Sequence, residues 1–439
     1  MAKTSSTEPV YAIIDYEDKY VQPLILAAVK SRLPADVLVL VQSMTEVPST
    51  KAKVLQWMQY EALDFERAMG QASSLFINSY VIRKALIRKH YLSTTVSHWN
   101  SKHPGSALSR HVTPGVEFEL DFAEFLDDAL VEAFELRESF EKNDSLDAAE
   151  RQWWILKPGM SDRGQGIRLF STEEELTSIF EEWDPPSDDE EEDEDATHSS
   201  DERDGSDEDK AESNGIMTSQ LRHFIAQPYI HPPLLFSAPF SSAGRKFHIR
   251  TYVLAVGALK VYVYKPMLAL FAGQTYSTPW KSESGDPNNE LSGHLTNTCL
   301  QTGEREGSVH PFWSLPEHAA KLPREWKESV YGQICTVTGE VFEAAARGMM
   351  IHFQPLPNAF ELFGLDFMVD EAGVAWLLEV NAFPDFAQTG SELNHLIEGL
   401  FEEVVDVAIK PFFGLEPEGN ETQETGRMAK VLDIDLGRR

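Results

Sequence analysis

The chain has 439 residues, with 38 Lys and Arg against 71 Asp and Glu, which gives a formal net charge of −33 at pH 7. This length suits two or three domains of roughly 100–200 residues each. The hydrophobic content of 42% is typical of a globular protein and excludes a fibrous or wholly disordered chain. Because so acidic a chain repels a nucleic-acid backbone, we expect no direct binding of DNA or RNA.

Cysteine usage and hydropathy bear on the compartment. The only cysteines are Cys299 and Cys335, which offer no disulfide framework and indicate a reducing compartment, the cytosol or the nucleus. Residues Met1 to Pro9 lack the apolar region of a signal peptide, and no apolar run is long enough to cross a membrane. We therefore expect a cytoplasmic protein without membrane contact. We also expect a monomer.

Strand and helix patterns alternate at the start of the chain. The apolar runs Val10–Asp15 and Val37–Gln42 predict strands, and Leu24–Ser31 between them predicts a helix. Together they predict a small α/β domain over residues 1–68. Further along, Phe122–Phe140 has apolar residues at helical spacing with an acidic outer side, which predicts an amphipathic helix with one solvated face.

The next segment combines strands, glycines and an acidic insert. Trp153–Leu156 and Ile167–Phe170 predict two strands joined by the glycine loop Gly159–Gly166, and this is a hairpin because no helix pattern follows the glycines. Glu173–Trp183 predicts a helix. Asp184–Glu212 then holds 16 acidic and two basic residues. With nothing apolar to bury, residues 185–215 predict a disordered loop, either solubilising or regulatory and partner-binding.

From residue 224 the chain is rich in strands. The predicted strands are Phe224–Tyr229, Arg245–Val256, Leu259–Tyr264, Phe363–Val369 and Val374–Val380, with helices at Trp326–Met350 and Glu392–Ile409. Antiparallel strands with flanking helices indicate the α+β class. The predicted organisation is a central domain over residues 69–235 that carries the insert, a C-terminal domain over 236–413 and a flexible tail over 414–439.

A row of basic side chains marks the longest predicted strand. Alternation in a strand places Lys246, His248 and Arg250 on one face, with Phe247 and Ile249 on the other. Three such groups in a row need an anion opposite them, and a polyphosphate meets that need. The alternative is an exposed strand face with ordinary charges.

Two carboxylates and an amide mark the last predicted hairpin. If Asp370–Gly373 forms its turn, Asp366 lies opposite Leu377, and Glu379 is a diagonal neighbour on the same face with Asn381 beyond it. Hard oxygen ligands in this arrangement suit Mg²⁺ shared with phosphates, and Mn²⁺ would also be accepted. The alternative is a structural acid pair.

A lysine before the glycine loop is the third feature. Lys157 follows a predicted strand, where it can neutralise a phosphate while the backbone N–H groups of the loop close over the rest. The glycines alone are a weak signal, because an ordinary hairpin turn would also contain them.

Taken together, these segments resemble the tubulin-tyrosine ligase family, an ATP-grasp group of ATP-dependent carboxylate–amine ligases. The resemblance runs from about residue 75 to 410, in the family's order and spacing. The matching stretches are Trp154–Pro158 with its glycine loop, Ile225–Ile230, Gly244–Arg250, His294–Asn297, Phe363–Phe367 and Leu378–Asn381. Leu86–Lys89 resembles the family's upstream nucleotide-contacting run and points to Lys89 rather than Lys84.

The resemblance implies an ATP-grasp fold and a set of roles. It implies that ATP binds with Mg²⁺, that a carboxylate is phosphorylated, and that an amine then attacks the acyl phosphate. The implied adenine hinge is Gln227, Pro228, Tyr229 and Ile230; the implied phosphate and acyl-phosphate contacts are Lys89, Lys157, Lys246, Arg250, Lys265, Thr296 and Asn297; and the implied metal ligands are Asp366, Glu379 and Asn381.

Two departures from the family pattern leave the acceptor open. His248 stands where tubulin-tyrosine ligases usually have Asp, and Ala382–Phe386 replaces a small-residue sequence. The variant looks most like fungal relatives linked with cytoplasmic mRNA-decay bodies, called P-bodies. Three readings remain: a ligase that acts on a protein tail, an ATP-binding scaffold with weak or lost catalysis that binds mRNA-decapping proteins, and a small-molecule amino-acid ligase.

Overall fold

The computed structural model describes residues 8–159, 165–183, 221–281, 291–296, 308–319, 321–389, 393–415 and 426–437. The chain forms two compact units, one made of Met1–Pro114 with Ile230–Arg439 and the other of Gly115–Tyr229. Within the described ranges no helix is long and apolar enough to cross a membrane. The predicted acidic insert, residues 185–215, lies outside the described residues.

A four-stranded parallel sheet opens the first unit, with strand order β2-β1-β3-β4. Its strands are β1 (Val10–Asp15), β2 (Leu38–Leu40), β3 (Lys53–Met58) and β4 (Leu75–Ile77). Helix α1 (Val21–Arg32) contains the predicted helix and buries Ile25 and Val29 in the same apolar cluster as β1. The short helices that follow are α2 (Phe65–Gly70), α3 (Lys84–Ile87), α4 (Lys89–Lys102) and α5 (Leu108–His111).

The centre of the first unit is an antiparallel sheet around one long strand, β9 (Arg245–Val256). Strand β13 (Phe360–Val369) pairs along one edge of β9, while β11 (Leu268–Thr275) and β10 (Lys260–Tyr264) share the other edge. The remaining strands are β14 (Ala375–Ala382) beside β13, β12 (Val309–Pro311) beside β11 and β15 (Met428–Asp433) beside β10. The predicted α+β class is confirmed.

The register predicted for the β13–β14 hairpin is wrong. Asp366 lies opposite Glu379 rather than Leu377, and Val369 lies opposite Ala375. The register shifts between Asp366 and Phe367, so that β14 contributes one extra residue, Leu378. Such a bulge changes which face the following side chains occupy. Here it leaves the apolar core on one side of β14 and places polar side chains on the other.

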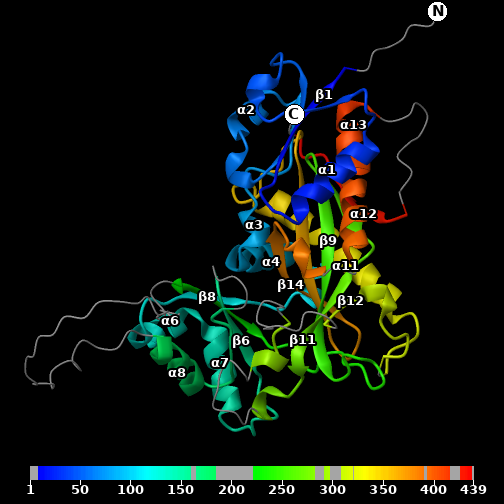
Figure 1. Ribbon diagram of the computed structural model, residues 1–439. Helices are drawn as coiled ribbons and strands as arrows, with labels where there is room; N and C mark the ends of the chain where they lie inside the picture. Colours follow the sequence, from blue (N-terminus) through cyan, green and yellow to red (C-terminus); the bar gives the residue numbers. More distant parts are fainter. Residues whose placement is uncertain are drawn as a thin grey trace, which may run out of the picture. The chain divides into compact units, whose positions relative to one another are not determined.

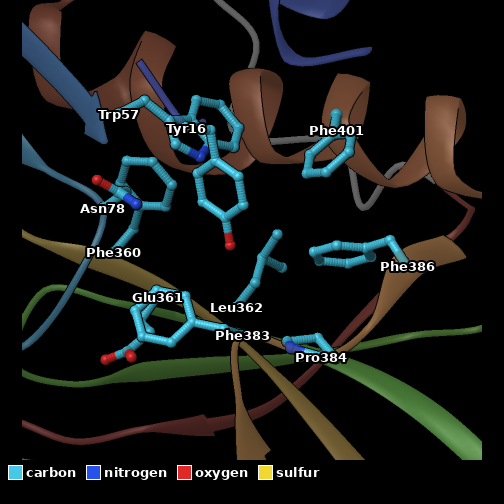
Figure 2. A pocket seen from close by; sticks show the side chains of 10 residues that line it. All are labelled: Tyr16, Trp57, Asn78, Phe360, Glu361, Leu362, Phe383, Pro384, Phe386 and Phe401. Atoms are coloured by element: carbon cyan, nitrogen blue, oxygen red, sulfur yellow. The ribbon is translucent and has the colours of Figure 1, made fainter. Parts of the chain in front are cut away.

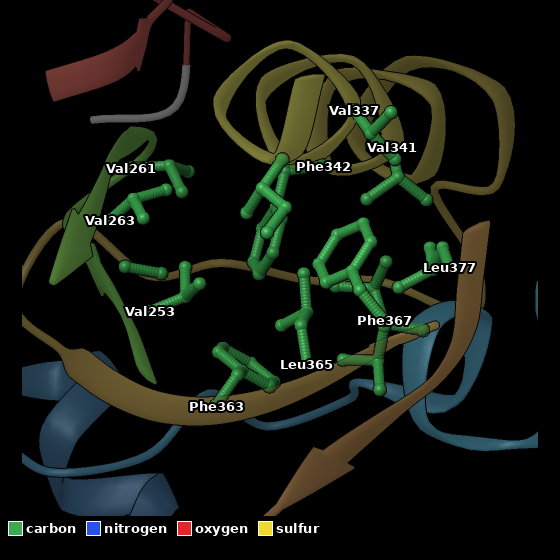
Figure 3. Close-up of a cluster of buried hydrophobic side chains, with 14 of the residues drawn as sticks. Val253, Val261, Val263, Val337, Val341, Phe342, Phe363, Leu365, Phe367 and Leu377 are labelled. Atoms are coloured by element: carbon green, nitrogen blue, oxygen red, sulfur yellow. The ribbon is translucent and has the colours of Figure 1, made fainter. Parts of the chain in front are cut away.

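Both faces of the antiparallel sheet are covered by helices. Helix α11 (Trp326–Gly348) packs on one face, where Val337, Val341 and Phe342 point toward Phe363 and Leu365 of β13, as Figure 3 shows. On the other face lie α12 (Asn394–Val404), the π-helical turn Val405–Ile409 and α13 (Lys410–Phe413), next to α1 (Figure 1). The predicted last helix is thus divided into three segments.

The second unit is a four-stranded sheet with strand order β5-β8-β6-β7, all antiparallel. The strands are β5 (Val116–Glu119), β6 (Trp154–Pro158), β7 (Arg168–Phe170) and β8 (His223–Pro228), with helices α6 (Leu126–Glu132), α7 (Phe134–Asn143) and α8 (Glu173–Trp183) (Figure 1). The predicted β6–β7 hairpin is confirmed, although residues 160–164 of its loop are not described.

The single helix predicted over Phe122–Phe140 is wrong, because the chain breaks at Ala133 between α6 and α7. Leu130 and Leu136 are both fully buried, yet they are six residues apart and would face different sides of one straight helix. The break at Ala133 therefore allows both leucines to reach the same core.

Candidate functional site

The basic row on β9 is buried. Lys246, His248 and Arg250 are 5–6% exposed, while Phe247 and Ile249 on the opposite face belong to the α11 core. This excludes the alternative of an exposed strand face. Burial of several potentially charged groups is costly unless each has a partner of opposite charge or a ligand.

Arg250 finds one partner on the neighbouring strand. The β9–β13 register places Arg250 opposite Asp366, and the guanidinium donates two hydrogen bonds to that carboxylate, from Nε to Oδ1 at 2.5 Å and from Nη2 to Oδ2 at 3.1 Å. His248 Nε2 lies 3.7 Å from the same Oδ1. Arg250 Nη1 and His248 Nε2 are both buried without a hydrogen-bond partner among the described residues, so two nitrogens of the row are left for a ligand.

The predicted metal ligands lie together on the same hairpin. Asn381 Nδ2 is 3.1 Å from Glu379 Oε1 and 3.4 Å from Asp366 Oδ2. Lys89, at the start of α4, brings its ammonium to 3.8 Å from Glu379 Oε2. The bulge accounts for this cluster, because it sets Glu379 directly across from Asp366. Six predicted residues from three separate parts of the sequence thus meet at one place in the first unit: Lys89, His248, Arg250, Asp366, Glu379 and Asn381.

Burial and nearby charge keep the row in defined protonation states. Burial lowers the pKa of His248, and the charge of Asp366 opposes this only in part, so the imidazole is neutral near pH 7. Burial lowers the pKa of Arg250 as well, but the charge and hydrogen bonds of Asp366 outweigh it and the net shift is upward. The row therefore combines a fixed guanidinium with a neutral imidazole whose Nδ1 lies 2.5 Å from Thr296 Oγ1.

Two histidines near Lys246 were not predicted as site residues. Burial, followed by the charge of Lys246, lowers the pKa of His294 to about 4. Burial also lowers the pKa of His231; the charge of Glu371 opposes this shift, and that of Lys246 adds to it. Tyr276 lies between them, with its hydroxyl 2.6 Å from His231 Nδ1 and its ring 5.5 Å from that of His294. The His294–Asn297 motif was a signal for His294, whereas nothing in the sequence pointed to Tyr276.

The remaining predicted phosphate contacts differ in their placement. Lys265 is exposed and its ammonium lies over the rings of Trp313 and Tyr331, at 5.3 and 5.9 Å from their centres. The structure therefore places this lysine in an aromatic contact in the connection between β10 and β11. Asn297 lies outside the described residues.

In the second unit, Lys157 and the predicted adenine hinge are on neighbouring strands. Lys157 Nζ donates to Gln227 Oε1 at 2.8 Å, because the β6–β8 register makes the two residues diagonal neighbours on one face. Pro228 ends β8, and the Tyr229 amide donates to the carbonyl of Trp153. Ile230 begins the return of the chain to the first unit.

The donor set fits a hard divalent cation. Among the described residues no three His, Cys, Asp or Glu side chains cluster as a metal site, so the protein would supply two carboxylates and the amide oxygen of Asn381. Mg²⁺ is commonly held in this way, by one or two carboxylates with phosphates and water completing its shell. The orphaned Arg250 Nη1 beside these carboxylates fits a bound phosphate.

The segment after Asn381 is packed by residues that sequence reasoning missed. Phe383 has a φ of 55°, and the Arg83 guanidinium lies over its ring at 5.1 Å and over that of Tyr60 at 3.9 Å. Arg83 also pairs with Glu361, Nε to Oε1 at 3.3 Å. Burial raises the pKa of Glu361 to about 7, against the effect of Arg83. In the sequence, the sign of this arrangement was an acidic residue, Glu361, between apolar residues at the start of strand β13.

A small cavity of about 20 Å³ lies beside that support and is shown in Figure 2. Its lining includes Tyr16, Glu361 and Pro384 together with aromatic side chains of the N-terminal sheet, β13 and α12. Nearby, Phe386 stacks on Tyr252 of β9, with ring centres 5.4 Å apart. The volume suits about one water molecule, so this cavity is too small to be a substrate pocket.

Comparison with solved structures defines the fold of the protein. The chain is similar to the C-terminal domain of Pby1 from K. lactis, described as an ATP-grasp enzyme that interacts with the mRNA decapping enzyme Dcp2, with a TM-score of 0.69 and 34% identity over 97% of this chain and 99% of that one. The fold is therefore ATP-grasp, as the sequence predicted.

Comparison with sequences defines the family. The tubulin-tyrosine ligase family model matches residues 70–416. A probable tubulin–tyrosine ligase of Schizosaccharomyces pombe is 45% identical over 93% of this chain and 94% of its own length. The probable tubulin–tyrosine ligase PBY1 of Saccharomyces cerevisiae is 42% identical over 87% of this chain, although the match covers 49% of that longer protein. This chain belongs to the tubulin-tyrosine ligase family.

Proposed function

We propose that the chain is an ATP- and Mg²⁺-dependent carboxylate–amine ligase that acts through an acyl phosphate. The observation that carries the proposal is the buried basic row of β9 facing Asp366, with Glu379 and Asn381 on the adjoining strand. A cationic row beside a hard-oxygen cluster, inside an ATP-grasp fold, suits the transfer of a phosphoryl group from ATP to a carboxylate.

Each part of the site has a proposed task in this reaction. Lys246 and Arg250 neutralise the transferred phosphoryl group, and the neutral His248 donates a hydrogen bond without adding charge. Lys89 and Lys157 bind phosphates, with Lys265, Thr296 and Asn297 as further proposed contacts. Gln227, Pro228, Tyr229 and Ile230 hold the adenine. Asp366, Glu379 and Asn381 hold Mg²⁺ or Mn²⁺, which would supply charge neutralisation when bound.

The acceptor is proposed by class. The net charge of −33 favours a partner with a basic surface and opposes docking on an acidic tubulin tail. We propose a protein tail presented by such a partner, in a cytoplasmic or P-body setting and with the ligase as a monomer. A small amino-acid acceptor remains the alternative substrate of the same chemistry.

A second candidate function is an ATP-binding scaffold with weak or no ligase activity. One observation favours it: the similar K. lactis domain is described as interacting with Dcp2. His248 is in keeping with such a role, because a neutral imidazole replaces the acid usual in the family and alters the charge beside the phosphates.

An ADP-release assay separates these candidates. Purified protein with Mg·ATP is mixed in turn with single amino acids, pairs of amino acids, acidic peptides and purified decapping proteins. Release that one acceptor stimulates, and that Glu379→Gln abolishes, supports the ligase. Saturable binding of Mg·ATP without release under any of these conditions contradicts the ligase and supports the scaffold.

A further inference from the structure

We propose that the outer surface of α6 and its flanking turns docks a basic, apolar segment of another protein. The surface, which we call the acidic aromatic patch, consists of Phe122, Phe125, Val131 and Phe134 with the carboxylates around them. The proposal goes beyond the ligase and scaffold functions, and it does not depend on nucleotide binding.

Exposure of large apolar side chains singles out this surface. The described residues include nine large hydrophobic side chains that are exposed, and four of them lie within the 13 residues from Phe122 to Phe134. Val131 and Phe134 are 64% and 63% exposed, and Phe125 is 47% exposed. Single exposed apolar residues are common, but a concentration of this kind on a protein surface marks an interaction site.

The fold of the second unit does not account for these side chains. The same segment already fills the local core with Leu126, Leu130, Leu136 and Phe140, which are at most 4% exposed. The four exposed side chains are interspersed with these along the sequence and belong to none of that core. Phe122 and Phe125 contact each other edge to face, with ring centres 6.3 Å apart. Aromatic residues are enriched at protein interfaces.

Charge identifies the kind of occupant. From Asp121 to Glu138 the chain has seven carboxylates and a single basic residue, Arg137, whose guanidinium donates to the backbone carbonyl of Asp127 at 3.2 Å. Asp121 and Glu138 are already paired with Arg222 and Lys142, at 3.4 and 2.7 Å, so the five carboxylates between them carry the negative charge of the surface. A segment that presents apolar side chains flanked by Lys or Arg is complementary to this surface. Nucleic acid and anionic lipid carry the wrong charge, and a second copy would bring the same carboxylates face to face.

The test uses two fluorescein-labelled peptides with the full-length protein at physiological ionic strength. One is an amphipathic Leu/Lys peptide with Leu at helical spacing, and the other replaces every Leu by Ser at the same charge. Fluorescence anisotropy should show the Leu/Lys peptide binding about tenfold or more tightly, a difference of about 1.4 kcal/mol. Phe125→Ser with Phe134→Ser should remove that preference, while the matched exposed control Ile351→Ser should retain it.

Thermal unfolding establishes that the double variant is folded, as expected for exposed positions. Hydrogen exchange should show protection over residues 121–138 when the Leu/Lys peptide is bound. The proposal is overturned if both peptides bind equally, if the double variant keeps the preference, or if protection appears elsewhere. It is also overturned if light scattering shows a wild-type dimer that the double variant abolishes, because the occupant would then be a second copy.

Discussion

The two halves of strand β9 have the same backbone geometry, but one half buries basic side chains where the other half buries apolar and aromatic ones. On the same face, the first half carries Lys246, His248 and Arg250, and the second half carries Tyr252 and Leu254, all of them buried. Leu254 belongs to the apolar cluster built with α12 and the N-terminal sheet, whereas Arg250 is paired with Asp366. Burial alone therefore does not distinguish a residue of the hydrophobic core from a residue of the candidate site. The side chain that it contacts on the neighbouring strand makes that distinction.

The largest expected effect is on the charged half. Asp366→Ala leaves the buried Arg250 without its carboxylate and should cost about 3–5 kcal/mol of unfolding free energy. The double variant Arg250→Met with Asp366→Leu removes both charges and should recover most of that loss while remaining inactive. Urea denaturation of the three proteins measures this, and a single variant as stable as wild type would contradict the pairing.

On the apolar half, Leu254→Ala should cost about 2–5 kcal/mol through loss of buried surface and a residual cavity. Because Leu254 lies outside the site, the folded fraction should bind Mg·ATP with wild-type affinity. Denaturation and nucleotide titration together check this prediction. A large loss of nucleotide affinity would show that the two halves are not separate in function.

Acid should weaken the region around Lys246. The folded pKa of His294 is about 4, below its ordinary value of 6.5, so between these values the unfolded chain binds a proton that the folded chain does not. Stability should therefore fall as pH falls from 6.5 to 4, by at most about 3 kcal/mol. Glu361, with its raised pKa of about 7, acts in the opposite direction.

Comparison of wild type with His294→Gln isolates the histidine, since Glu361 is common to both. The variant should lose less stability than wild type between pH 6.5 and pH 4, as measured by urea denaturation across that range. Parallel curves for the two proteins would mean that His294 takes up its proton equally in the folded and unfolded states.

The smallest expected change in stability belongs to Glu379, one of the three proposed metal ligands. The Glu379 side chain is 32% exposed, so Glu379→Gln should change the unfolding free energy by no more than about 0.5 kcal/mol. Turnover of Mg·ATP should fall about 100-fold or more, because a carboxylate proposed to hold the metal beside the phosphates is lost. Glu371→Gln on the exposed turn of the same hairpin is the control, and unchanged turnover in Glu379→Gln would remove this residue from the metal site.

Much of the site could be predicted because it depends on local rules. Strand alternation was enough to place Lys246, His248 and Arg250 on one face. Two apolar runs separated by a short turn were enough to predict the hairpin that carries Asp366. The resemblance added Lys89, which lies far from both in sequence and which the structure places beside Glu379.

Other features depend on packing and could not be predicted. The register of β14 is displaced by one residue at the turn itself, where Val369 lies opposite Ala375, and by one more at the bulge of Leu378; no residue of the turn encodes that bulge. The contact of Arg250 with Asp366 joins residues 116 apart in the sequence. To predict it, one would have to know that β9 and β13 are neighbouring strands. The break at Ala133 has the same origin, because it serves two leucines that one straight helix could not bury together.

The most direct measurement is a crystal structure with Mn²⁺ and a non-hydrolysable ATP analogue, with the metal located by anomalous scattering. The account predicts an anomalous peak coordinated by Asp366, Glu379 and Asn381, with the terminal phosphates against Lys246 and Arg250. A peak held by other residues, or a triphosphate bound away from the basic row of β9, would contradict it.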